Sequence, residues 1–371
     1  MRIILIVAVL PLVLCAIISS VAAQEVPEES TSNASAELAT SGMVIDGIPE
    51  LHFGKGRDCT FFGALSTCLC HLGEQVTYEY LMGVSGAAFA TRFRKDWSVL
   101  SADPTVVPDH TKAALQAVGY SYEWIGSGMQ TAQQLVIDSI DRGVPVVAMQ
   151  LANYLDWGLI VGYSRGGDIW VCRTYHDKGA DYSKAAKLPP TMLILGQKSE
   201  PPSTDELLKR SVELAVQFAK GEKRPSDSRF ESGLKAFDAW ADALQSSELA
   251  QTTGRQLEIL QHINAWLYSC LVDARTAGVA YLRWAAKLLK GDAAKHLNEA
   301  ANLYDEEVKL LKDGREAVPY PSKNESEVRW TAELRAKQIE VLRAALEKEK
   351  EAIANLEKAI SSFNANEAVG P

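Results

Sequence analysis

The chain has 371 residues, of which 47% are hydrophobic and 23% charged, with 25 glycines and 14 prolines. This composition is that of a globular protein and excludes a collagen-like, disulfide-dense or wholly disordered chain. The formal charge of −9 at pH 7 provides no general attraction to nucleic acid or anionic lipid, and the sequence contains no obvious local basic patch. We therefore expect no nucleic-acid partner.

The first 23 residues are typical of an export signal. Arg2 precedes an apolar run over residues 3–23, which ends in the sequence Val-Ala-Ala. Small residues at these last positions fit cleavage after Ala23. We therefore predict a signal peptide over 1–23 and an exported protein, periplasmic or extracellular. The run is also long enough to span a bilayer, so an uncleaved membrane anchor formed by residues 3–23 is the alternative.

Residues 24–46 are polar and poor in large apolar side chains, which predicts a flexible tether. The next part of the chain, 47–198, has a mixed pattern. Hydrophobic spacing and glycine stops predict helices over 58–72, 111–118 and 130–142. Apolar runs predict strands over 145–150, 157–163, 168–173 and 189–196. The sequence SRGG at 164–167 predicts a hairpin between the second and third of these strands.

Residues 199–203 contain two prolines and predict a linker. Beyond it the pattern is helical, with helices expected over 204–220, 228–244, 255–289, 292–312 and 326–361. We therefore expect a helical bundle domain over 204–362 and a disordered tail over 363–371. The predicted fold is an α+β domain followed by an all-α domain.

Export changes the expected chemistry of the cysteines. Removal of Cys15 with the signal leaves Cys59, Cys68, Cys70, Cys172 and Cys270, an odd number in an oxidising compartment. Cys68 or Cys70 could pair with Cys172, or most of these thiols could be buried apolar groups. Positions 68 and 70 point about 200° apart on a helix, so they cannot bind one metal ion together. We expect no metal and no cofactor.

Three sequence segments resemble a known family. They are GRDCTFFG at 56–63, YLMGVSGAAF at 80–89 and DWGLIVGY at 156–163. In this order they resemble the papain-like domains related to the C39 peptidases, in particular the butirosin-biosynthesis H N-terminal group, over residues 48–195. The resemblance implies a cysteine nucleophile, Cys59, at the start of the first long helix. The amides and dipole at such a helix end favour a thiolate, so they can lower the pKa of the thiol.

The sequence departs from the catalytic members of this group at the partners of the cysteine. Those members have a histidine immediately before the aromatic-Gly-aliphatic strand, where this chain has Asp156. An aspartate with an ordinary pKa of about 3.9 is a weak base for a thiol. Neither Arg173 nor Thr174 matches the orienting carboxylate or amide expected at the end of the next strand. A glutamine shortly before the cysteine, which assists the oxyanion in papain-like enzymes, is also absent.

Two histidines could replace the missing base. His176 follows the predicted hairpin, where Asp177 could orient it, and His52 lies seven positions before Cys59. The alternative for His176 is an exposed loop histidine, which is the more common situation. Asp156 could bind substrate, cap the hairpin or be a solvated charge.

These observations support two hypotheses on function. In the first, the papain-like site is degenerate, and the cleft near Cys59 binds a peptide or small molecule. In the second, the protein is a thiol enzyme, a cysteine peptidase or an acyltransferase, in which Cys59 is the nucleophile and His176 or another non-standard group is the base. The resemblance to the butirosin group implies acyl transfer from a carrier protein, which is cytoplasmic chemistry. We favour binding, because export separates the protein from such donors.

Overall fold

The computed structural model describes residues 42–151, 155–321 and 330–368. The predicted export signal and residues 24–41 of the predicted tether lie outside the described residues. Within the described ranges, no helix is long and apolar enough to cross a membrane. Helices and antiparallel strands occur together, so the chain has the α+β class expected from its sequence.

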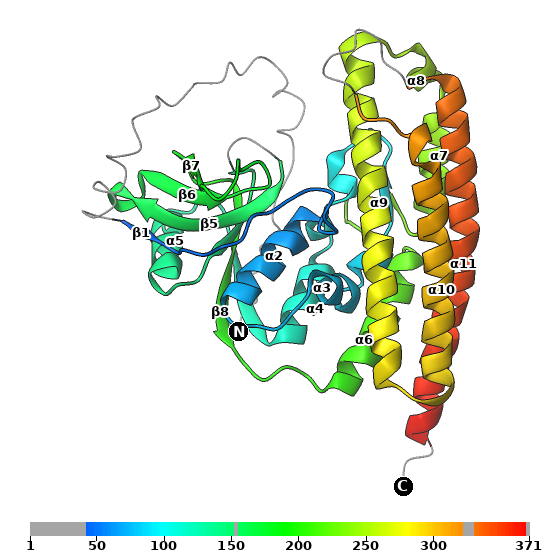
Figure 1. Ribbon diagram of the computed structural model, residues 1–371, viewed down its shortest axis with the longest axis horizontal. Coiled ribbons are helices and arrows are strands. Elements are labelled where there is room, and N and C mark those ends of the chain that lie inside the picture. Colours follow the sequence, from blue (N-terminus) through cyan, green and yellow to red (C-terminus); the bar gives the residue numbers. More distant parts are fainter. Residues whose placement is uncertain (1–41, 152–154, 322–329, 369–371) are drawn as a thin grey trace.

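A seven-stranded antiparallel sheet forms one side of the described structure (Figure 1). Its strand order is β3-β8-β4-β5-β6-β7, and β1 pairs with the end of β5. The strands are β1 (Met43–Val44), β3 (Tyr120–Ile125), β4 (Val146–Met149), β5 (Trp157–Ser164), β6 (Ile169–Arg173), β7 (Ser183–Ala185) and β8 (Thr191–Lys198). The predicted hairpin is confirmed, because β5 and β6 pair antiparallel. β1, which lies in the predicted tether, β3 and β7 are not among the predicted strands.

Three helices, α2 (Thr60–His71), α3 (Tyr78–Val84) and α4 (Pro108–Val118), lie between this sheet and the helical half of the chain (Figure 1). α2 begins later than predicted, because Cys59 has extended backbone and forms the N-cap. α4 begins earlier than predicted at Pro108, since proline fits the first turn of a helix. α5 (Ala132–Asp141) packs against the sheet.

The second half of the chain is mostly helical, as predicted. Its helices are α6 (Thr204–Ala219), α7 (Leu234–Leu244), α8 (Ser247–Gln251), α9 (Gly254–Leu288), α10 (Gly291–Asp313) and α11 (Ala332–Ala368). The helix predicted over 228–244 is wrong in its first part. Residues Phe230–Ser232 form β9, which pairs with β2 (Arg92–Arg94) from the first half. Gly233 has φ 63° and ψ −141°, a conformation that favours glycine and separates β9 from α7.

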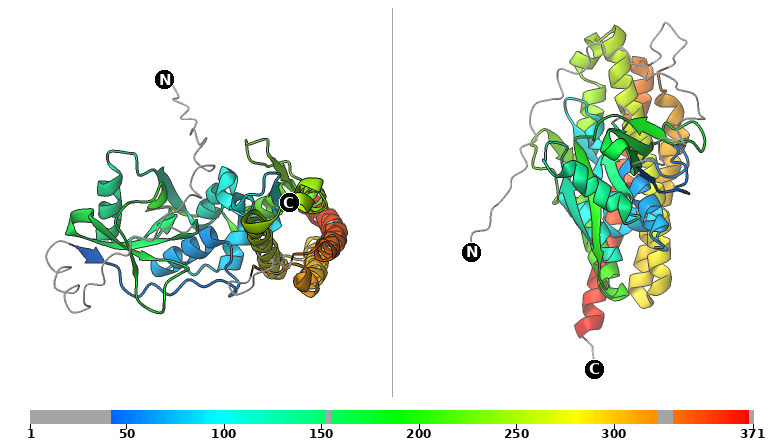
Figure 2. Two further views of the ribbon diagram at one scale, coloured as in Figure 1. Left: turned by 90° about the horizontal axis from the view of Figure 1, so that it is seen from above. Right: turned by 90° about the vertical axis from the view of Figure 1, so that its left-hand side faces the viewer.

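The two halves of the chain share one hydrophobic core. Phe61 and Met82 of the first half belong to the same buried cluster as Tyr281, Tyr304 and Leu356 of the second. α9 lies against α3 on one side and α10 on the other, and Figure 2 shows the bundle from above.

The contact between α3 and α9 requires a glycine. A Cβ atom on Gly83 would lie 1.9 Å from Cγ of Tyr281, so only glycine permits this approach of the two helices. The packing of α9 against the short helix α3 therefore depends on the absence of a side chain at Gly83.

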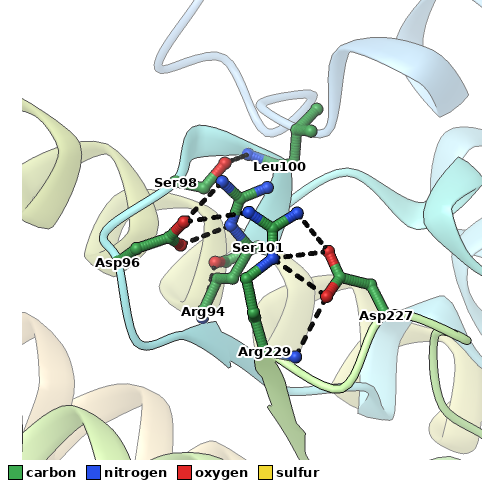
Figure 3. Close-up of polar contacts among 7 residues, drawn as sticks. All are labelled: Arg94, Asp96, Ser98, Leu100, Ser101, Asp227 and Arg229. Atoms are coloured by element: carbon green, nitrogen blue, oxygen red, sulfur yellow. Dashed lines mark hydrogen bonds and ion pairs between the residues drawn. The ribbon is translucent and has the colours of Figure 1, made fainter. Parts of the chain in front are cut away.

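A polar network joins the halves around β2 and β9 (Figure 3). Arg229 binds Asp227 at 2.6 Å, and its second guanidinium nitrogen lies 3.3 Å from Oδ2 of Asp96. Asp96 also binds Arg94, whose backbone amide donates to Ser101. This network therefore reinforces the pairing of two strands that are far apart in sequence.

A buried arginine makes a further connection. The Nε of Arg275 donates to Oε2 of Glu349 at 2.8 Å, while its two other nitrogens donate to Ala88 O and Thr91 Oγ1. Glu307 lies 3.4 Å from the same Nε, and neither of its carboxyl oxygens has a hydrogen-bond partner among the described residues. Burial, together with the neighbouring Glu349, raises the pKa of Glu307 well above its usual range. Arg275 is therefore paired with Glu349, and Glu307 is held protonated beside them.

Candidate functional site

Cys59 lies at the start of α2, where the sequence places it. Its backbone amide donates to Oη of Tyr78 at 3.1 Å, and the residue is 8% exposed. The next residue, Thr60, accepts a hydrogen bond from the Trp157 amide at 3.2 Å. This contact brings the first residue of β5 against the first turn of α2.

The environment of the Cys59 thiol disfavours the thiolate. Burial raises the pKa of Cys59 far above its ordinary value, and the carboxylates of Asp103 and Asp273 raise it further. The Phe62 amide at the helix start and the Arg92 guanidinium lower the pKa, but they do not compensate for burial. The direction is opposite to that predicted from the helix end alone. The reason is that desolvation of a charge in a closed site outweighs the helix dipole.

The space around the thiol is small. Cys59 lines a cavity of about 40 Å³ that it shares with Cys270 of α9 and Arg92 of β2. Such a volume can hold a water molecule but not a peptide. In Figure 1, α9 stands beside the start of α2. The closed space therefore results from the packing of the helical half against Cys59.

Asp273 of α9 is connected to Cys59 through Tyr78. Tyr78 donates a short hydrogen bond to Oδ2 of Asp273, and the same hydroxyl accepts the Cys59 amide. Burial raises the pKa of Asp273 to about 6, with a further contribution from Asp58, although the bond from Tyr78 lowers it. Asp273 is not among the site residues predicted from the sequence. The sequence feature that could have indicated it is a carboxylate within a largely apolar helix.

His176 and Asp156 are brought together by the structure. Nε2 of His176 lies 2.8 Å from Oδ2 of Asp156, with both side chains partly exposed. The predicted role of Asp177 is wrong, because Asp177 forms a buried ion pair with Arg173 and accepts from Thr174. The group that orients His176 is therefore Asp156.

The other candidate base, His52, pairs with a glutamate. The Nε2 of His52 lies 2.9 Å from Oε2 of Glu50, and its side chain is 51% exposed. The neighbouring Phe53 contacts the rings of His176 and Trp266, at centroid distances of 5.5 and 5.4 Å. The His176–Asp156 pair is thus connected to α9 through an aromatic cluster.

Of the two alternatives for the cysteines, the structure shows free thiols, most of them buried, rather than a pairing of Cys68 or Cys70 with Cys172. All five cysteines of the described chain are free. Cys68 and Cys70 donate instead to the carbonyl oxygens of Pro145 and Val76. Among the residues that the structure describes, no group of three or more His, Cys, Asp or Glu side chains is arranged to hold a metal ion.

A larger, open pocket is lined by Asp273 and by Asp58, the residue before Cys59. It has a volume of about 340 Å³, within the usual size of small-molecule sites. It is lined by Gly54, Gly56, Asp58, Ser269, Val272, Asp273, Thr276, Lys312 and Arg315. Asp273 belongs to this wall and also accepts the hydrogen bond from Tyr78. Tyr78 and Asp273 therefore connect the wall of this pocket to the backbone of Cys59.

The arrangement can bind a polar ligand next to a buried thiol. We compared the sequence with models of known protein families and with curated proteins, and neither comparison found a match.

Proposed function

We propose that this protein has a degenerate papain-like site and that it binds a peptide or another small ligand in the open pocket beside Cys59. The observation that carries the proposal is the difference between the small cavity at Cys59 and the open pocket. Cys59 lines a cavity of about 40 Å³ and its pKa is raised by burial, whereas the wall of the pocket of about 340 Å³ includes two acidic and two basic residues among apolar surface. A ligand in this pocket meets Asp58 and Asp273 rather than sulfur.

The papain-like relationship is part of the proposal. It is supported by the motifs at 56–63, 80–89 and 156–163 and by the α+β class of the chain. The bond from the Trp157 amide to Thr60 also supports it, because it joins the cysteine helix to the strand that follows the expected histidine position.

A thiol enzyme is the second candidate, and one observation favours it. In the catalytic members of the group that the sequence resembles, the histidine precedes one strand and the orienting acid or amide ends the next. Here Asp156 occupies the histidine position, and His176, three residues after the end of β6, lies 2.8 Å from its carboxylate. Catalysis would require the imidazole to reach Cys59 and α9 to move away from the thiol.

Alkylation distinguishes the two candidates. The mature protein is treated with iodoacetamide between pH 5 and 9, and mass spectrometry of peptides measures each cysteine separately. We expect Cys70, which is exposed, to react as an internal control, and Cys59 to react only after denaturation. Reaction of native Cys59 with a midpoint well below about 8.5 would instead establish an activated thiolate and favour the enzyme.

Binding is tested with a panel of short peptides by isothermal titration calorimetry. We expect Cys59→Ser to leave the affinity unchanged and Thr276→Trp to abolish binding by filling the pocket, since Thr276 is an exposed residue of its wall. Ala280→Trp is the matched control, because Ala280 is exposed one turn further along α9 and outside the pocket. Failure of every peptide to bind, or equal binding by the Thr276→Trp variant, would contradict the proposal.

A further inference from the structure

The open pocket has walls of opposite charge. Lys312, near the end of α10, and Arg315, in the turn that follows it, supply two cations. Asp58, just before α2, and Asp273 of α9 supply two carboxyl groups. Hydroxyl groups of Ser269 and Thr276 and the backbone around Gly54 and Gly56 complete the lining. The walls come from three segments that are distant in the sequence.

Arg315 is held in place by two aromatic rings, and its guanidinium is near enough to Asp58 to lower the pKa of that carboxyl against the rise caused by burial. Its guanidinium lies 5.8 Å from the ring centre of Tyr268 and 5.2 Å from that of Tyr320, which are cation–π distances. Tyr320 is itself fixed by a hydrogen bond with Ser269. Within the described ranges neither Arg315 nor Lys312 forms an ion pair at contact distance, and the interaction of Arg315 with Asp58 is electrostatic only. A preorganised guanidinium of this kind is suited to bind a carboxylate through two parallel hydrogen bonds.

The acidic wall is also preorganised. Oδ1 of Asp58 accepts the Gly54 amide at 2.6 Å, and Oδ2 of Asp273 accepts the Tyr78 hydroxyl. The two carboxyl groups repel each other, since Asp58 raises the pKa of Asp273 in addition to burial. A cation placed between them reduces the repulsion between the two carboxylates and offsets the free-energy cost of burying their charges.

Building on the binding function proposed above, we infer that the pocket takes a zwitterionic ligand, a short peptide with both termini free. Its terminal carboxylate binds Arg315 and Lys312, and its terminal ammonium binds Asp58 and Asp273. Blocking either terminus removes one charge-assisted contact and leaves a partly buried protein charge unpaired. Recognition therefore depends on the two ends of the ligand more than on its side chains.

The test uses the mature chain and four probes in isothermal titration calorimetry: dialanine, N-acetyl-dialanine, dialanine amide and the doubly blocked N-acetyl-dialanine amide. We expect dialanine to bind most tightly and each single block to weaken binding by about 10- to 100-fold, the range for one charge-assisted hydrogen bond. Arg315→Gln should abolish the discrimination against the amide but retain that against the acetyl group. Asp58→Asn should do the converse.

Arg283→Gln is the control for these variants. Arg283 is an exposed arginine of α9 that pairs with Asp305 outside the pocket, so this change should leave the affinities of all four probes unaltered. Circular dichroism establishes that each variant is folded.

The outcomes separate this inference from the proposed function. Equal affinity of the four probes, with Thr276→Trp abolishing all binding, would overturn the zwitterion inference and leave the binding function intact. Discrimination that persists unchanged in both Arg315→Gln and Asp58→Asn would also overturn it. Absence of pocket-dependent binding by any peptide, blocked or free, would overturn both.

Discussion

The imidazole of His176 is hydrogen-bonded to the carboxylate of Asp156, 20 positions earlier in the chain, at 2.8 Å. Asp156 precedes β5 and His176 follows β6, so the hairpin brings them together. Cys59 belongs to a different network, formed with Tyr78 and Asp273 of α9. The residues that could supply a base and an acid are therefore paired with each other, while the thiol is enclosed by a helix from the second half.

This separation predicts the effect of removing the imidazole. We expect native Cys59 to resist iodoacetamide in His176→Ala just as it does in the natural chain, as measured by time courses and mass spectrometry. His52→Ala is the control, since His52 pairs with Glu50. A slower rate in His176→Ala alone would mean that the imidazole activates the thiol.

Because the His176–Asp156 pair is partly exposed, a double-mutant cycle in urea should give a coupling of no more than about 1 kcal/mol.

Asp273 should make the stability depend on pH. Its pKa in the folded protein, about 6, is above the ordinary aspartate value of 3.8, so the fold favours the protonated carboxyl. The resulting stabilisation is present below the unfolded pKa and is lost as the pH rises through about 6. The shift corresponds to about 3 kcal/mol, because one pKa unit is about 1.4 kcal/mol.

We therefore expect the free energy of unfolding of the natural chain to fall, relative to that of Asp273→Asn, between about pH 4 and pH 7. Urea denaturation of both chains across this range measures the difference. A difference that is independent of pH would show that Asp273 is ionised in the fold as readily as in the unfolded chain.

The two glutamates near Arg275 should respond differently to the same substitution. Glu349→Gln removes the partner of a buried guanidinium and should cost about 3–5 kcal/mol. Glu307→Gln replaces a carboxyl that is already protonated, so we expect a change below about 1 kcal/mol. Urea denaturation of the two variants at pH 7 provides the comparison. Equal losses, or a larger loss for Glu307→Gln, would contradict the assignment of the charge to Glu349.

The close approach of α3 to α9 predicts a large effect of a single methyl group. Gly83→Ala should destabilise the protein by about 1–3 kcal/mol or more, because the new Cβ would lie 1.9 Å from Cγ of Tyr281. Gly128→Ala is the matched control, since a Cβ at Gly128 would meet no atom within 4 Å. Thermal and urea unfolding measure both variants. Equal stability of the two would show that the helices can separate without cost.

Much of the fold follows from local sequence patterns. The 3–4 spacing of apolar residues and the glycine stops predict α6, α9 and α10 nearly to their ends, and SRGG at 164–167 predicts the β5–β6 hairpin. These predictions succeed because helices and tight turns depend on residues that are neighbours in the chain. The prediction for 228–244 fails at β9, where pairing with β2, more than 100 positions away, overrides the helical pattern.

The sequence by itself determined the α+β class, the helical nature of the second half and the position of Cys59 at a helix start. Only the tertiary structure decided what surrounds that cysteine. α9 places Asp273 next to Tyr78, 195 positions away, and encloses the thiol. Burial and hydrogen bonding depend on contacts between remote segments, so desolvation reverses the pKa shift that the helix end alone predicts. For the same reason the oppositely charged walls of the open pocket emerge only when the loop before α2, α9 and the end of α10 are packed together.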